Sequence, residues 1–191
     1  MTVTGAAQTE LLASIVAATR ERLAAAACSV AIVDGSELEF RVASGVGARE
    51  IVGLRMPADR GIAGWVVASG QTVAVADADS DGRFDRNTAQ QTGFLPTSIL
   101  ATPIEGDDGP IGVLEVLDRT NGPLDMQVVA DAARQVALVL ELVSAAARVD
   151  EVLADPALAE HLALLRELST LGVADRRLAA RLLAAVVEHA R

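Results

Sequence analysis

The chain has 191 residues with 26 acidic and 16 basic side chains, so its net charge is −10, and its length fits one domain with or without a helical appendage. The acidic balance argues against binding a phosphate backbone, and an aromatic content of 2% argues against a stacking surface for single-stranded nucleic acid. The single cysteine excludes an internal disulfide framework and any two-cysteine metal or redox motif.

The first part of the chain predicts a helix, a hairpin and a second, short helix. Apolar residues at helical spacing predict a helix over 6–27. Segments 28–35 and 37–45 are predicted antiparallel strands, because the Asp-Gly-Ser sequence between them is typical of a tight hairpin. After the irregular segment 46–60, residues 62–70 predict a short helix that ends at its glycine.

The next part predicts three strands and a long helix. A strand over 71–77 leads into a long polar connection, 78–96. Two further strands, over 97–106 and 110–119, are joined by an acidic turn, and a helix follows over 124–153. Runs of strands bracketed by helices indicate an α+β fold with an antiparallel sheet.

The predicted order of elements also indicates two different sheet faces. The first and last helices can cover one face, which leaves the other under segments 46–60 and 78–96. Loops as long as 78–96 are uncommon in compact domains and are often binding loops. We therefore expect a small-molecule pocket beneath these segments.

The C-terminal residues predict two more amphipathic helices, over 157–168 and 174–190, for which we expect docking within the protein or on a partner. The expected organisation is a domain over 1–150 and a helical tail over 151–191. No apolar run approaches the roughly 20 residues of a membrane span, and the first residues lack the basic head of a signal peptide. We therefore expect a cytoplasmic protein with no membrane partner.

An ordered series of motifs carries a family resemblance. The series CSV, ELEFRVASG, PADRGIAGWVVASGQ, TGF, SILATPI and IGVLEVLDRTNG resembles a GAF domain over roughly residues 7–148, most closely the regulatory GAF domains of cyclic-nucleotide phosphodiesterases. The resemblance implies a six-stranded antiparallel sheet, a ligand pocket closed by a lid at 78–96, and terminal helices that form a homodimer.

The resemblance also marks candidate ligand-binding residues: Ser29, Ile62, Ala63, Trp65, Phe84, Thr92, Phe94 and Glu115. The amides that open the helix at Ile62 favour a phosphate, while Thr92 and Glu115 are suited to hydrogen-bonding a purine edge. Trp65 either lines the pocket or fills the core. The two phenylalanines either close over a ligand or anchor the lid to the sheet.

Several family positions differ in this chain. A Phe-Asp pair common after the second strand is Ala43-Ser44 here, which removes a stacking ring and a base-reading carboxylate. The family's Asn-Lys…Phe…Asp-Glu signature appears as Asp118-Arg119…Leu124…Val128-Val129. Since an unpaired buried polar group costs about 1–3 kcal/mol, we expect cyclic AMP and cyclic GMP to bind weakly or not at all.

Other chemistry-bearing residues are interpreted as structural. Asp77, Asp79, Asp81 and Gly82 match the start of a calcium loop, but its twelfth position is Thr88 instead of glutamate, so we expect a solvated acidic turn and no metal site. Cys28 is expected to be a small buried hydrophobe. GAF proteins that reduce methionine sulfoxide use several cysteines, and this chain has one. The histidines, His161 and His189, are expected on the tail's helix surfaces.

Two functions remain open from the sequence. The first is a regulatory module of signal transduction that senses a small molecule, of unknown identity, as a dimer and acts through its terminal helices. The alternative is a GAF scaffold without a ligand that recruits a signalling partner through its C-terminal helices. No catalytic constellation is present, so we expect no enzymatic activity.

Overall fold

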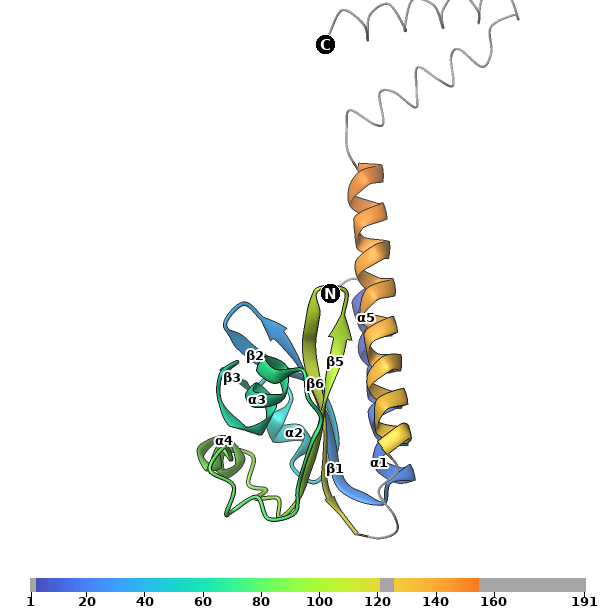
Figure 1. Ribbon diagram of the computed structural model, residues 1–191. Helices are drawn as coiled ribbons and strands as arrows, with labels where there is room; N and C mark the ends of the chain where they lie inside the picture. The colour runs from blue at the N-terminus through green and yellow to red at the C-terminus, as the bar shows by residue number, and fades with distance from the viewer. Residues whose placement is uncertain (1–2, 121–125, 155–191) are drawn as a thin grey trace, which may run out of the picture. The chain divides into compact units, whose positions relative to one another are not determined.

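The computed structural model describes residues 3–120 and 126–154. These residues form a six-stranded sheet with helices on both sides (Figure 1). The elements in chain order are α1 (Val3–Arg22), β1 (Ala25–Asp34), β2 (Glu37–Gly45), α2 (Ala48–Ile51), β3 (Arg55–Pro57), α3 (Gly61–Ser69), β4 (Val73–Val75), α4 (Arg86–Gln91), β5 (Ile99–Gly106), β6 (Gly109–Arg119) and α5 (Met126–Ala154).

The sheet is antiparallel throughout, with the strand order β3-β2-β1-β6-β5-β4. Its two central strands, β1 and β6, come from opposite ends of the domain and pair from Ala25–Arg119 to Ile32–Gly112. This pairing brings the first and last helices to the same face. The predicted α+β class and the six-stranded antiparallel sheet are confirmed.

One face of the sheet is filled by α1 and α5, which lie side by side against it (Figure 1). Apolar residues from both helices and from the central strands form one buried cluster, including Leu12, Val16, Cys28, Val30, Leu114, Val129 and Val136. The predicted helical cover of this face is therefore correct.

The opposite face packs against α3 and the irregular segments. Its buried cluster includes Leu38, Phe40, Met56, Ile62, Val66, Val113 and Leu117. Period-two alternation separates the two clusters along β6, since Val113 and Leu117 belong to this cluster while Leu114 belongs to the helical one. As predicted, segments 46–60 and 78–96 cover this face, because residues of both line the cavity described below.

Two predicted chain reversals are confirmed. The β1–β2 hairpin turns through Gly35 and Ser36, with Gly35 at φ +62°, a conformation that glycine adopts without strain. Helix α3 ends at Gly70, which has left-handed backbone angles and donates its amide to the Val66 carbonyl.

The predicted first helix, 6–27, is too long at its C-terminal end. Helix α1 ends at Arg22, Ala24 takes a left-handed φ of +48°, and Ala25 already begins β1. Alanine favours helices, yet Ala25 and Ala27 pair with Arg119 and Leu117 of β6. Pairing in the centre of the sheet thus overrides local propensity.

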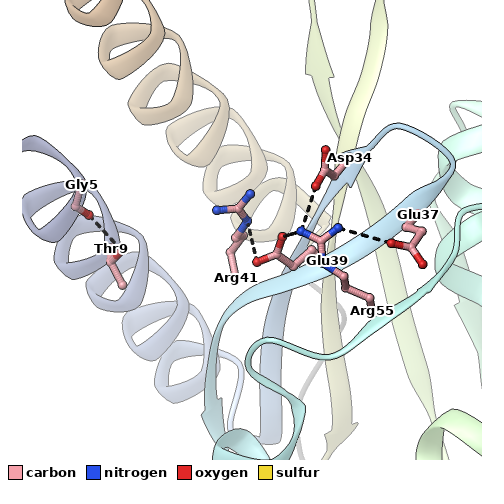
Figure 2. A network of polar contacts seen from close by, with 7 residues as sticks. All are labelled: Gly5, Thr9, Asp34, Glu37, Glu39, Arg41 and Arg55. Carbon is pink, nitrogen blue, oxygen red and sulfur yellow. Dashed lines mark hydrogen bonds and ion pairs between the residues drawn. The ribbon is translucent and has the colours of Figure 1, made fainter. Parts of the chain in front are cut away.

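Two segments expected to be irregular contain regular elements. Segment 46–60 contains α2 and β3. Strand β3 completes the six-stranded sheet, because the sequence segments predicted only five strands. The lid contains α4. Strand β3 is fixed by Arg55, whose guanidinium contacts Asp34, Glu37 and Glu39 on the neighbouring strands (Figure 2). Arg41 adds an ion pair to Glu39 at 3.3 Å, so this edge of the sheet carries a continuous charge network.

The chain divides into two compact units, residues 1–143 and 144–191, and the second is described only to residue 154. The helices predicted over 157–168 and 174–190, with His161 and His189, lie outside the described residues. The expected domain boundary at residue 150 stays a prediction. No helix in the described part of the chain is long and apolar enough to span a membrane.

Candidate functional site

A cavity lies between the sheet and the segments that cover its second face. The cavity is open to solvent, and its empty space amounts to about 670 Å³ when the solvent at its mouth is counted in. Strands β1, β2 and β6 form its floor, α3 and the β2–α2 loop form its walls, and the lid segment around α4 covers it. The lining is predominantly apolar, with a few polar groups, which is typical of small-molecule sites.

Glu115 is the central polar group of the floor. It is 8% exposed and lies on β6 opposite Ser29 of β1, whose hydroxyl donates to Oε2 at 3.3 Å. Burial raises the pKa of the Glu115 carboxyl to about 7, and the Ser29 hydrogen bond opposes this rise. The carboxyl is therefore poised between its neutral and charged forms near neutral pH.

The two carboxylate oxygens of Glu115 differ in their contacts. Oε1 accepts no hydrogen bond within the described residues. In that same part of the chain, no side-chain oxygen or nitrogen is both buried and without a partner. Oε1 therefore keeps some exposed surface, and because Glu115 lines the cavity, we infer that this surface is available to a ligand there.

The start of α3 forms one wall. Gly61, Ile62 and Ala63 line the cavity, and Ile62 and Ala63 are 3% exposed. The close approach of this helix to the preceding loop requires a glycine at the next position, because a Cβ on Gly64 would lie 2.7 Å from the Ala58 carbonyl oxygen. The first amides of α3 have no partner within the helix itself.

The lid is a capped short helix with an aromatic residue on either side. Asp85 caps α4, since its carboxylate accepts from the amides of Asn87 and Thr88 and from the Thr88 hydroxyl. Phe84 and Phe94 both line the cavity and pack against the apolar cluster beneath it. This position is compatible with both roles expected for them, ligand closure and lid anchoring.

Thr92 lines the cavity, but its hydroxyl is used at the end of α4. It donates to the Ala89 carbonyl at 2.8 Å and accepts from the Phe94 amide at 3.3 Å. Hydrogen bonding to a ligand would compete with these local contacts.

Trp65 is the one predicted site residue that does not line the cavity. Its half-buried ring packs against the apolar cluster of this sheet face, and the Arg83 guanidinium lies 4.5 Å from the ring centroid. Arg83 is held in turn by the Asp81 carboxylate, with contacts of 2.9 and 2.7 Å. Trp65 thus connects α3 to the start of the lid.

The positions at which the chain departs from the family have structural partners here. Ala43 lines the cavity with a methyl group, and the hydroxyl of Ser44 accepts from Arg20 Nε of α1 at 3.1 Å. Asp118, at φ +48°, accepts from the amides of Thr97 and Ser98 at 2.7 Å each. Val128 and Val129 belong to the buried cluster between the sheet and helices α1 and α5.

The remaining candidate groups have partners or are buried. Asp81 pairs with Arg83, which lowers the pKa of Asp81 to about 2, and Asp79 pairs with Arg86 at 2.8 Å. Within the described residues, no cluster of three potential metal ligands occurs. Cys28 is fully buried in the helical core, and burial raises its pKa to about 12.

Several lining residues were missed from the sequence, among them Phe40, Met56, Asp85, Ala89 and Pro96. Only Asp85 carries a clear sequence signal, because an aspartate at the start of a helix is a preferred N-cap. The others are placed by strand register and lid path, which single residues do not reveal.

Comparisons with known proteins agree with this architecture. The GAF domain model matches residues 8–140. The dual 3',5'-cyclic-AMP and -GMP phosphodiesterase 11A of Takifugu rubripes is 35% identical over 69 residues, which are 36% of this chain and 8% of that enzyme.

Solved structures are similar in fold. The GAF domain of a phosphoenolpyruvate-protein phosphotransferase from Coxiella burnetii aligns with a TM-score of 0.65 at 22% identity, covering 74% of this chain and 86% of that one. The free methionine-R-sulfoxide reductase of Neisseria meningitidis aligns with a TM-score of 0.60 at 24% identity, covering 73% and 81%. The family match spans more than half of the sequence, and the sheet order and helical cover agree with it, so the chain belongs to the GAF domain family.

Proposed function

We propose that this GAF domain senses a small molecule in the cavity and passes the signal on through its terminal helices. The cavity itself carries the proposal, because it combines an apolar lining with a polar floor at Ser29 and Glu115. The residues proposed to contact the ligand are those of the predicted set that line it: Ser29, Ile62, Ala63, Phe84, Thr92, Phe94 and Glu115.

A physical route connects the cavity to the helices. Ala43 lines the cavity, and the adjacent Ser44 accepts a hydrogen bond from Arg20 of α1. A ligand that changes the end of β2 therefore changes a contact of α1 directly. It shifts the protein between states only by the difference in its affinity for them.

Co-purification tests the sensing proposal. Native mass spectrometry of freshly purified full-length protein should show a bound small molecule that is lost on denaturation. Ala89→Phe, which places a ring in the cavity, should abolish this mass. Gln90→Phe adds the same ring at an exposed, non-lining position of α4 and should retain it. No bound mass, together with no binding of any probe, would favour the ligand-free scaffold.

We also propose a homodimer through α1 and α5. Leu11, Leu138 and Leu142 are exposed by 54%, 53% and 69%, although they lie on helices whose other sides fill the core. Such leucines are usually covered by a partner when they gather on one surface. Leu138→Arg should give a monomer mass in light scattering, whereas Leu95→Arg, at a similarly exposed leucine outside these helices, should remain dimeric.

A cyclic nucleotide is the second candidate ligand, favoured by the relative whose name includes both cyclic AMP and cyclic GMP. We expect weak or no binding, because Ala43 offers neither a stacking ring nor a carboxylate. Titration calorimetry with both nucleotides measures this directly. A sub-micromolar dissociation constant for either would contradict the expectation.

A further inference from the structure

The charges that line the cavity are all acidic. Among the described residues that line the cavity, Glu115 and Asp85 carry acidic side chains and none is a lysine, arginine or histidine, while Cys28 lines it with its thiol buried in the cluster on the other face of the sheet. The thiol of Cys28 stays neutral because burial raises its pKa to about 12. The two carboxyl groups therefore decide which ligand charge the cavity accepts.

Only one of these carboxyl groups is open to a ligand. Both oxygens of Asp85 accept hydrogen bonds from α4 itself. Within residues 3–120 and 126–154, Glu115 accepts a hydrogen bond only from Ser29, through Oε2, and its Oε1 keeps exposed surface at the cavity. An open carboxylate oxygen on an apolar floor is a directional acceptor for an N–H donor.

The arginines near the lid do not offset this charge. Arg83 pairs with Asp81, Arg86 pairs with Asp79, and the exposed Arg60 precedes α3 without lining the cavity. The start of α3 contributes a partial positive charge of about half an elementary charge at most. It suits an uncharged acceptor, such as a carbonyl or hydroxyl, on the same ligand.

We propose that the ligand of this cavity carries a cationic nitrogen donor, an ammonium or amidinium group on an otherwise apolar body, which Glu115 binds while organic anions are rejected. The inference rests on the proposed sensing function and specifies its ligand class. An anion would meet Glu115 without a basic side chain to pair with among the described lining residues, whereas a cation satisfies the open oxygen Oε1.

The proposal also predicts that the affinity for a cationic ligand depends on pH. The sheet neighbours of Glu115 are Ser29 on β1 and Ala101 on β5, and the thiol of Cys28, beside Ser29, interacts with Glu115 electrostatically. Ile62 and Ala63 of α3 and the lid, whose single lining charge is Asp85, line the same cavity. A cation binds the charged carboxylate, and the pKa of free Glu115 is about 7. Its affinity should therefore increase between about pH 5.5 and about pH 8.

The test uses three probes of equal size and different charge: benzamidine, benzamide and benzoate. Saturation-transfer NMR with the full-length protein gives their relative affinities, and the fluorescence of the single tryptophan, Trp65, follows binding beneath the lid. We expect benzamidine to bind at least about tenfold more tightly than benzoate. Glu115→Gln should remove that preference and its pH dependence, while Glu105→Gln, at an exposed non-lining glutamate, should retain both.

Two results overturn the charge inference alone. One is benzoate binding as tightly as benzamidine, and the other is a preference for benzamidine that survives in Glu115→Gln. In either case, if Ala89→Phe prevents the probes from binding, the cavity would still be the ligand site. If no probe binds and no small molecule co-purifies, both the proposed sensing function and the charge inference are contradicted.

Discussion

The two faces of the sheet use the same strands for different purposes. On the face covered by α1 and α5, Val16, Leu114 and Val136 are fully buried in one apolar cluster. On the other face, Glu115 and Leu117 border a cavity. Because successive side chains of β6 alternate between the faces, stability and binding are separated residue by residue along one strand. Substitutions on neighbouring positions should therefore have very different effects.

The largest expected effect is on the helical face. Leu114→Ala removes a fully buried side chain from the apolar cluster under α1 and α5 and should lower the free energy of unfolding by about 3–5 kcal/mol. Leu117→Ala makes the same change on the same strand beside existing empty space, so its cost should be about 1–2 kcal/mol smaller. Urea denaturation of both variants measures the difference. Equal losses would show that the two faces are equally packed.

Glu115→Gln tests the cavity face through the pH dependence of folding stability. The pKa of Glu115 is raised in the folded state to about 7 from 4.5, so its neutral form favours folding at low pH. This stability is fully present below about pH 4.5 and is lost as pH rises through about 7. At pH 8 the variant should therefore be more stable than the wild type by up to about 3 kcal/mol.

Below pH 4.5 the two proteins should unfold almost equally, since both side chains are then neutral. Thermal unfolding across this pH range provides the measurement, with Glu105→Gln as the exposed control. A constant difference between Glu115→Gln and the wild type at all pH values would contradict the burial of this charge.

Asp118 links β6 to residues 97 and 98, which follow the lid segment. Asp118→Ala removes the acceptor for two amides and places alanine at φ +48°, so we expect a loss of about 1–3 kcal/mol. Asp118→Asn keeps an acceptor and tolerates this backbone, so it should recover most of the stability. Chemical denaturation distinguishes them, and identical losses would mean that the hydrogen bonds contribute little.

The smallest expected effect is on the lid. Arg83→Ala removes the cation above Trp65 and should change stability by about 0.5–1 kcal/mol or less. It should nevertheless shift the Trp65 emission and increase quenching by added iodide. Arg86→Ala removes a nearby exposed ion pair as a control and should leave the emission unchanged. An unaltered spectrum in Arg83→Ala would mean that Arg83 does not hold the lid to α3.

Local sequence signals predicted the features that depend on local chemistry. Gly35 and Gly70 mark chain reversals because each takes a backbone conformation that glycine favours. Alternation and helical spacing predicted which elements cover each face. The predicted start of the first strand, at residue 28, was wrong. Ala25 and Ala27 carry no strand signal, and their conformation depends on pairing with β6.

The site was predictable where the family motifs mark it. Glu115 and Ser29 were identified by resemblance, and register places them side by side on the floor. Trp65 lies away from the lining because the start of α3, and not its middle, faces the cavity. The acidic character of the lining depends on which arginines are paired elsewhere, a property of three-dimensional arrangement that the sequence does not express.

The edge strands of the sheet bear on how the protein behaves in concentrated solution. β3 and β4 are each three residues long, and they leave little unpaired backbone on which a strand from another molecule could add. On β3, Pro57 has no amide to donate, and Arg55 is surrounded by carboxylates. Both edges therefore oppose amyloid-like growth. Copies of this domain should remain dispersed at concentrations where proteins with long, bare sheet edges form fibrils.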